Sequence, residues 1–384
     1  MLKKALAASI AALSLLSLSA HADFVYRTPA GMKFSPAEAA TSAPSGVSKL
    51  ACGIDHCYAL RDGNIWSVGR NNYGQLGAPS LSADTSVWTD TGVAADDVAA
   101  GDYHGLALIN GNVWSVGYNA QGQLGRPDAG SYHGAWTDTG VQATAISAAQ
   151  LYSLAIVNGN VHHAGENGYR TAGDGTTYDH GTFTDTGRAA EKIAAGDRHA
   201  LAISGGRVFS TGENNYGPLG LGTQTTEAVW RDTGFDADEI AAGYRISYAI
   251  KNGTVWSSGH NRYGQSGRSS THYCSGYGCT LSFGDTGQSA TAISAGYLSG
   301  YAIDGGIIKS VGRDAHGELG IGQSAGSYTV SWQDTGLSAE VIEGSQYFVV
   351  AASGGQLLGS GSNTFGQLGT GNTDNQNIFT AAQE

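Results

Sequence analysis

Residues 69–77 read GRNNYGQLG, and six variants of this stretch recur along the 384-residue chain. The later copies begin at Gly117, Gly165, Gly212, Gly259, Gly312 and Gly361, and successive copies are 48, 48, 47, 47, 53 and 49 residues apart. A fixed period of this length is typical of arrays in which each unit buries one face against its neighbours. The motif therefore predicts seven structural units of one kind.

Four short apolar runs separate consecutive motifs. Residues 134–173 show them as GAWTDTGV, TAISAA, YSLAIV and NVHHAG, with the turn Asn158-Gly159 before the last run. Alternating apolar residues predict strands, and an Asn-Gly pair between two runs is a strong hairpin signal. We expect the Trp-x-Asp-Thr-Gly run to be the first strand of each unit. Seven units of four antiparallel strands predict an all-β, seven-bladed β-propeller around a central channel.

The propeller is expected to span residues 48–384. The first unit has no Trp-x-Asp-Thr-Gly run before it, whereas Ile378-Phe379-Thr380 after the seventh motif is a truncated version of that run. We therefore expect the C-terminal strand to complete blade 1 and close the ring. Residues 23–47, an N-terminal arm or linker rich in Ala, Ser and Pro, are the alternative source of that strand.

The first 22 residues have the pattern of an export signal. Lys3 and Lys4 precede an apolar run over residues 5–18, and Ala20-His21-Ala22 forms a small-x-small cleavage site. The run is short for a membrane span, so residues 1–22 are predicted to be a signal peptide cleaved after Ala22. The mature chain is then secreted or periplasmic, without membrane insertion, and the sequence leaves these two locations open.

Charge and cysteine content constrain the partners and the compartment. Without Lys3 and Lys4, 18 basic residues face 32 acidic ones, a formal net charge of −14, which disfavours nucleic acid as a partner. The four cysteines form two local pairs, Cys52 with Cys57 and Cys274 with Cys279. In an oxidising compartment two local disulfides are expected. A zinc site is the competing interpretation, but C-x4-C is a poor match to the usual C-x2-C spacing.

No motif predicts catalysis, a metal site or a cofactor. Asp-Thr-Gly also occurs in aspartic proteases, but here it recurs six times at the repeat period, so we interpret it as a turn in which the carboxylate accepts backbone N–H groups. His56, His104 and His199 occupy equivalent places in three units. Equivalent blades keep such residues apart, so buried, hydrogen-bonded imidazoles are expected rather than a metal site.

The repeated unit resembles a known family. AAGDYHGLALINGNVWSVGYNAQGQLG over residues 99–125 is similar to the regulator of chromosome condensation repeat, and the similarity recurs over about residues 48–384. The resemblance extends to a secreted bacterial branch that includes propellers inhibiting β-lactamases by capping them with one face. It implies a seven-bladed propeller that serves as an interaction platform, although some members catalyse nucleotide exchange on small GTPases.

Two sets of loops are expected on one face of the ring. With alternating strands, the loops that contain the nine-residue motif and those after each Ala-Gly run emerge on the same side. The candidate partner-binding residues in these loops are Asp55, Asp102, Tyr103, Arg198, Tyr244, Arg245 and Tyr297 after the Ala-Gly runs, and Tyr132, His133, Tyr178 and Tyr273 in the longer loops. Tyrosine and arginine on adaptable loops over a rigid scaffold are typical of binding surfaces. By resemblance to the inhibitor propellers, Tyr103, Tyr244 and Tyr297 would lie at its centre.

The sequence thus favours a secreted, non-catalytic, monomeric propeller that binds a protein partner through its loop face. Two alternatives remain open. A carbohydrate-binding propeller would use the same tyrosines to stack on a glycan, and an exported effector would catalyse guanine-nucleotide exchange on a host GTPase.

Overall fold

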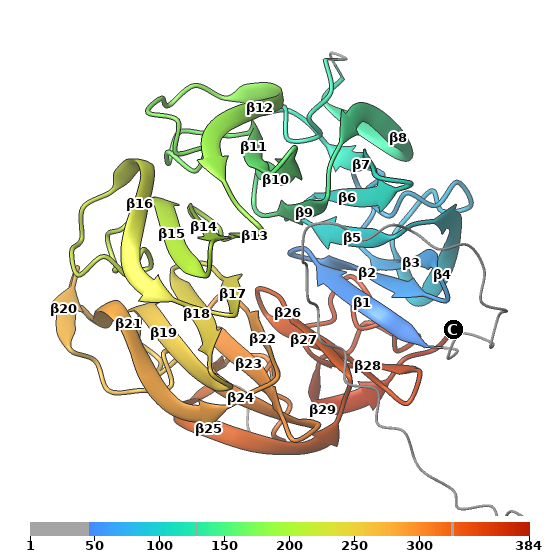
Figure 1. Cartoon of the computed structure of the whole chain (residues 1–384). Coiled ribbons are helices and arrows are strands. Elements are labelled where there is room, and N and C mark those ends of the chain that lie inside the picture. The colour runs from blue at the N-terminus through green and yellow to red at the C-terminus, as the bar shows by residue number, and fades with distance from the viewer. Residues whose placement is uncertain (1–45, 128–129, 324–325) are drawn as a thin grey trace, which may run out of the picture. The chain divides into compact units, whose positions relative to one another are not determined.

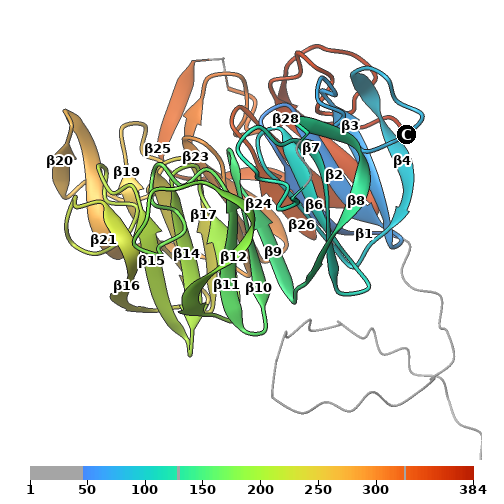
Figure 2. The same cartoon turned by 90° about the horizontal axis from the view of Figure 1, so that it is seen from above.

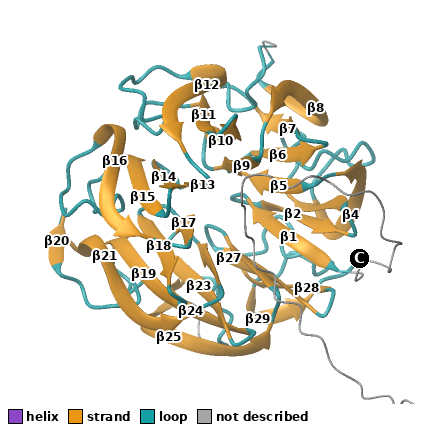
Figure 3. Cartoon of the chain, viewed as in Figure 1, coloured by secondary structure: helices purple, strands orange, loops and turns teal. Residues whose placement is uncertain are grey.

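The computed structural model describes residues 46–127, 130–323 and 326–384. The expected signal peptide and the segment 23–45 of the expected arm lie outside the described residues. The described part of the chain is built from strands, turns and loops (Figure 3). It contains no helix, and hence none that could cross a membrane.

Seven antiparallel sheets, the blades, follow one another along the chain (Figure 1). Blades 1 to 4 comprise β1 (Val47–Cys52), β2 (His56–Arg61), β3 (Asn64–Gly69) and β4 (Thr85–Ala94); β5 (Asp97–Ala100), β6 (His104–Ile109), β7 (Asn112–Tyr118) and β8 (Tyr132–Gln142); β9 (Ala145–Ala148), β10 (Tyr152–Val157), β11 (Asn160–Gly165) and β12 (His180–Ala189); β13 (Lys192–Ala195), β14 (His199–Ser204), β15 (Arg207–Gly212) and β16 (Glu227–Asp236). Blades 5 to 7 comprise β17 (Glu239–Ala242), β18 (Ile246–Lys251), β19 (Thr254–His260), β20 (His272–Cys274) and β21 (Tyr277–Ser289); β22 (Ala292–Ala295), β23 (Ser299–Asp304), β24 (Ile307–Asp314) and β25 (Ser327–Ser338); β26 (Val341–Gly344), β27 (Phe348–Ser353), β28 (Gln356–Gly361) and β29 (Gln376–Ala381).

The predicted seven-bladed β-propeller is confirmed. The first strand of each blade lies at the centre, where neighbouring first strands contact one another around a channel, and β26 contacts β1 to complete the ring. Seen edge-on, the strands run between the two faces of the ring (Figure 2). Blade 5 carries one strand more than the others, because the hairpin β20–β21 adds β20 to its outer edge.

The expected closure of blade 1 by the C-terminal strand is wrong. β29 pairs with β28 and completes blade 7, and blade 1 is completed by β4, which contains Trp88 and Asp90. The Trp-x-Asp-Thr-Gly run is therefore the outer strand of its own repeat and not the first strand of the next. The run pairs with the strand that precedes the nine-residue motif, so each blade consists of one continuous stretch of chain.

The ring is closed by contacts between blades 7 and 1. Leu50 and Trp88 of blade 1 pack in one apolar cluster with Phe348 and Val350 of blade 7. The residues after β29 add polar contacts, since the Trp88 N–H donates to the Gln383 carbonyl at 3.2 Å and Arg61 pairs with Glu384 at 2.5 Å. The ring is therefore closed by apolar packing and by the residues after β29, and not by a blade to which both ends of the chain contribute a strand.

The nine-residue motif is explained by the loop that it builds after the third strand. The Asn71 Oδ1 accepts the Leu76 N–H at 3.0 Å, and its Nδ2 donates to the Leu81 carbonyl at 3.1 Å. Leu76 is fully buried. Gly77 has φ +63°, and a Cβ there would lie 2.3 Å from the Nε1 of Trp136 in the next blade. Asparagine, leucine and the last glycine of the motif are therefore needed to fold the loop and to seat the neighbouring tryptophan.

The expected turns are also present. Asn158 and Gly159 have φ of 50° and 82°, as a two-residue I′ hairpin turn requires. The Asp90 carboxylate accepts the Gly92 N–H at 2.8 Å, and the Thr91 hydroxyl donates to the Ile65 carbonyl at 2.8 Å. These contacts confirm the structural interpretation of Asp-Thr-Gly.

Candidate functional site

The two predicted sets of loops share one side of the ring, here called the loop face. The inner loops join the first and second strands of each blade, and the repeat loops join its third and fourth strands. The inner loops surround the mouth of the channel and line a cavity of about 340 Å³, here called the well. Its inner-loop lining includes Ile54, Asp102, Tyr103, Gln150, Leu151, Asp197, Arg198, Tyr244, Tyr297, Ser345 and Gln346.

The structure divides the predicted inner-loop residues into two groups. Asp102, Tyr103, Arg198, Tyr244 and Tyr297 line the well. The other two are engaged outside its lining: Asp55 pairs with Arg70 at 3.2 Å, and the Arg245 guanidinium lies 4.4 Å from the ring centroids of both Tyr216 and Tyr244.

Aromatic rings from blades 4 to 7 form a continuous series, here called the aromatic band. It consists of Tyr277, His260, Tyr216, Tyr244, Tyr297, Tyr347 and His316, with Arg245 bridging Tyr216 and Tyr244. At its centre, Tyr244 and Tyr297 are stacked with centroids 3.9 Å apart and ring planes at 13°. The band extends from the hairpin of blade 5 to the well and on to blade 7.

A second aromatic cluster lies over blades 1 and 2. Tyr73 is its hub, with ring centroids 4.8 Å from Tyr118, 5.6 Å from Tyr103 and 6.5 Å from Tyr132. The predicted Tyr103 and Tyr132 are thus brought together.

The remaining predicted tyrosines are more peripheral. Tyr178 and Tyr273 belong to neither aromatic group and are 78% and 83% exposed. His133 is partly buried beside Tyr132 in β8. The structure therefore does not gather all the predicted outer residues into one site.

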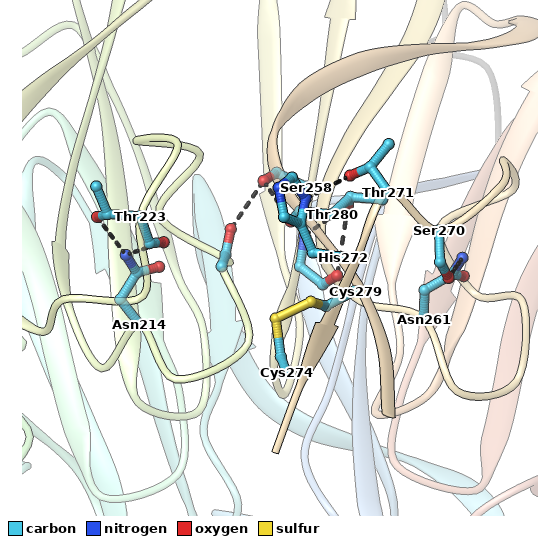
Figure 4. The surroundings of a disulfide bond; sticks show 12 residues. Asn214, Thr223, Ser258, Asn261, Ser270, Thr271, His272, Cys274, Cys279 and Thr280 are labelled. Carbon is cyan, nitrogen blue, oxygen red and sulfur yellow. Dashed lines mark hydrogen bonds between the residues drawn. A yellow bond between two sulfur atoms is a disulfide. The ribbon is translucent and has the colours of Figure 1, made fainter. Parts of the chain in front are cut away.

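Both expected disulfides are present. Cys52–Cys57 links β1 to β2, and Cys274–Cys279 links the two strands of the hairpin β20–β21. The hairpin is also held to the repeat loop before it, since the Thr271 N–H donates to the Cys279 carbonyl at 3.1 Å (Figure 4) and the Asn261 N–H donates to the Gly278 carbonyl at 2.8 Å. Two disulfides indicate an oxidising environment. In the hairpin the disulfide also supports Tyr277 at the outer end of the aromatic band.

Arginines on this face are held in place before any partner arrives. Arg198 lies over the Tyr169 ring at 4.2 Å and contacts Asp197 and Glu213 at 3.2 and 3.4 Å. Arg70 lies over Phe365 at 4.6 Å across the junction of blades 7 and 1. Because stacking and ion pairing restrict these long side chains, little of their conformational entropy remains to be lost on binding.

Carboxyl groups at the channel mouth have raised pKa values. Burial raises the pKa of Asp102 to about 7, and the nearby negative charges of Asp197 and Asp55 act in the same direction. Burial raises the pKa of Asp197 to about 6, although Arg198 and Arg245 oppose it. Glu343 of the inner strand β26 also has a pKa of about 7 because of burial, opposed by Lys49 and by a hydrogen bond from Ser294.

The equivalent histidines are buried at the start of the second strands of blades 1, 2 and 4. His56, His104 and His199 are almost completely buried, and burial lowers the pKa of each to about 3. The Nε2 atoms of His104 and His199 lie 2.9 and 2.8 Å from serine hydroxyls of the next blades, Ser153 and Ser247. His104 and His199 are thus neutral, hydrogen-bonded rings, as expected, whereas in the described residues neither ring nitrogen of His56 has a hydrogen-bond partner. Over residues 46–127, 130–323 and 326–384, no group of three or more His, Cys, Asp or Glu side chains could hold a metal ion.

Sequence reasoning missed part of the site. Tyr73, Tyr169 and Tyr216 all stand four residues after the first glycine of the motif, as do Tyr263 and Phe365. This repeated aromatic position was a usable signal, but none of these residues was among the predicted binding residues. Asp197 and Glu343 were also missed.

Family comparison supports the repeat assignment. Residues 62–108 and 47–75 match two models described as the regulator of chromosome condensation (RCC1) repeat. No curated protein matches the chain significantly.

Solved structures support the fold. Prp20p from Saccharomyces cerevisiae, in a study of its binding properties to Gsp1p and histones, is 19% identical with a TM-score of 0.73, and the match covers 88% of each chain. Yeast RCC1 (Prp20) bound to Kap60 is 19% identical with a TM-score of 0.71, covering 94% of this chain and 91% of that one. Human WBSCR16 is 18% identical with a TM-score of 0.71, covering 86% of this chain and 94% of that one. At these identities the similarity shows the propeller fold and not a shared function.

Proposed function

We propose that the protein is an exported, non-catalytic, monomeric propeller that binds a protein partner through its loop face. The aromatic band, with Arg245 stacked between two of its rings, is the observation that carries this proposal. Tyrosine, tryptophan and arginine dominate the binding energy of protein interfaces, and rings already packed on one another lose little entropy on docking. Yeast RCC1-type propellers provide a precedent for protein binding on this fold.

The proposed interface is centred on blades 4 to 7. The band crosses these blades, whereas the inner loop of blade 3 offers only Gln150 and Leu151 to the well. A protein interface of ordinary size, roughly 800 Å² on each partner, would be centred on the band and the well. Unequal blades favour one protein over a glycan, because a lectin-like array would repeat its site residues.

The test is direct binding of a partner identified by affinity capture. The mature chain, residues 23–384, captures candidates from periplasmic, culture-supernatant and host-cell extracts, and each candidate is then purified and its Kd measured. A Tyr103/Tyr244/Tyr297→Ala variant is expected to lose at least tenfold in affinity, as removal of interface hot spots does.

Ile378→Ala serves as the control, because Ile378 is exposed in the outer strand β29 and belongs to neither aromatic group. Equal affinity of the triple variant and the parent, with both folded, would refute the proposed face. Selective binding on a glycan array would support the carbohydrate alternative. Accelerated release of labelled nucleotide from a host GTPase would support the exchange alternative.

The export part of the proposal has its own test. N-terminal sequencing of the protein recovered from the periplasm or medium is expected to begin at Asp23. A mature protein that still carries Lys3 and Lys4 would contradict cleavage after Ala22.

A further inference from the structure

We propose that the well is a receptor for one cationic side chain, a lysine or an arginine, of the protein partner. This inference rests on the proposed function, since it assigns a ligand chemistry to the centre of the same face. The observation behind it is the Asp102 carboxylate, which has no cationic partner in the described residues and lies in a cavity rimmed by aromatic rings.

Three of the four carboxylates around the mouth already have a positive neighbour. Asp55 pairs with Arg70, Asp197 contacts Arg198 at 3.2 Å, and Lys49 of β1 acts on Glu343. Each of these three carboxylates therefore has at least one positive charge acting on it.

Asp102 differs from these groups. In the described residues its side chain has neither a hydrogen bond nor an ion pair, and the charges that act on it, Asp197 and Asp55, are both negative. Asp102 is half-buried, and withdrawing a carboxylate from water costs free energy unless it is paired. Asp102 lines the well, so the missing positive partner can be supplied only from the side of the loop face or along the channel.

The rest of the lining suits a long cationic side chain. Tyr103, Tyr244 and Tyr297 line the same cavity, and the faces of aromatic rings attract ammonium and guanidinium groups. A volume of about 340 Å³ leaves space for one long side chain together with water. The alkyl stem would contact the tyrosines while the charged end reaches Asp102.

The test uses NMR titration of the 15N-labelled mature chain with single-residue probes. The cationic probes are Nα-acetyl-lysine amide and Nα-acetyl-arginine amide, and the neutral probe is Nα-acetyl-norleucine amide. Each is added to about 50 mM, because a single side chain binds weakly. Saturable shifts of the amides at Gly101, Asp102 and Tyr103 are expected with both cations and not with norleucine.

Asp102→Asn is expected to weaken binding of the cationic probes at least threefold. The matched control is Asp374→Asn, which removes the same charge from an exposed position in the β28–β29 loop and should leave binding unchanged. The proposal is overturned if norleucine binds as well as the cations, if both variants weaken binding equally, or if no probe produces a shift.

The same variants separate this inference from the proposed function. A partner that binds Asp102→Asn as tightly as the parent, but not the Tyr103/Tyr244/Tyr297→Ala variant, would leave the face in place and refute the cationic receptor. A partner insensitive to all these changes would refute the face itself.

Discussion

Asp102 shows how a single residue on the loop face can reduce stability. Burial raises its pKa to about 7, so the folded protein binds the proton more tightly than the unfolded chain, whose aspartates titrate near 4. Stability contributed by the protonated form is therefore lost as the pH rises from about 4 to 7. A costly charge kept at the centre of the proposed binding face is typical of residues retained for function.

Asp102→Asn is accordingly expected to stabilise the protein. At pH 8 the free energy of unfolding should rise by about 1–3 kcal/mol, and the gain should shrink towards zero at pH 4, where the carboxyl is protonated in both states. Chemical denaturation of parent and variant at both pH values measures this. A variant that is less stable than the parent at pH 8 would contradict the account of Asp102.

The buried histidines respond to pH in the opposite sense. Because burial lowers the pKa of His104 to about 3, the unfolded chain binds its proton first, below about 6.5. The stability from each such histidine is complete above pH 6.5 and falls towards pH 3, by about 2 kcal/mol at pH 5. The ring resonances of His56, His104 and His199 should stay unshifted in NMR spectra from pH 8 to 4.5. Titration of any of these rings near pH 6.5 would show that it is solvated.

At the scale of the element, the repeat loop and the neighbouring tryptophan form one packing unit. Gly77→Ala adds a Cβ at 2.3 Å from Trp136 at a residue with φ +63°, so loop and ring must both move. The expected loss is at least about 3 kcal/mol of unfolding free energy, from strain and overpacking combined. Gly63→Ala is the control, since Gly63 has φ +80° but nothing within 4 Å of the added Cβ, and should cost about 1 kcal/mol. Similar losses for the two variants in thermal denaturation would argue against the packing unit.

The strands and turns were largely predictable from local sequence, but which strands pair with one another in a sheet was less predictable. The Asn158-Gly159 turn and the cysteine pairs depend on neighbouring residues, so sequence predicted them correctly. The Trp-x-Asp-Thr-Gly run lies between two repeats and could join either sheet. In the structure the run pairs with β3 and not with β5, and local sequence alone does not determine which of the two strands it joins. The wrong expectation about blade 1 follows from that ambiguity.

The candidate site was predictable to a similar extent. Strand alternation placed Tyr103, Tyr244 and Tyr297 on one face, and the structure places all three around the well. Sequence could not show that Tyr216 and Tyr347 extend the band, because their ring contacts join different blades. It also could not identify Asp102 as the carboxylate without a cation, since that requires the positions of every surrounding charge.

At the scale of the whole molecule, stability depends on the junction of blades 7 and 1. Deleting Ala382–Glu384 removes the backbone hydrogen bonds from Ala382 to Leu357, from Trp88 to Gln383 and from Gln383 to Gly369, together with the Arg61–Glu384 ion pair. The free energy of unfolding should fall by about 2–3 kcal/mol. Glu384→Gln removes only the ion pair and should cost less than about 1 kcal/mol. Unchanged thermal stability of the truncated chain would mean that apolar packing alone closes the ring.

The two ends of the described propeller meet at a single turn. The Gly46 N–H donates to the Asp62 carboxylate at 3.0 Å, and the adjacent residue Arg61 holds Glu384. Each blade is also one uninterrupted stretch of chain, so every sheet is formed by strands that follow one another in sequence. A circular permutant, with Gly46 joined to Glu384 by a short linker and new termini between two other blades, would keep every sheet intact. The opening of the ring could therefore be moved by whole repeats without breaking a sheet.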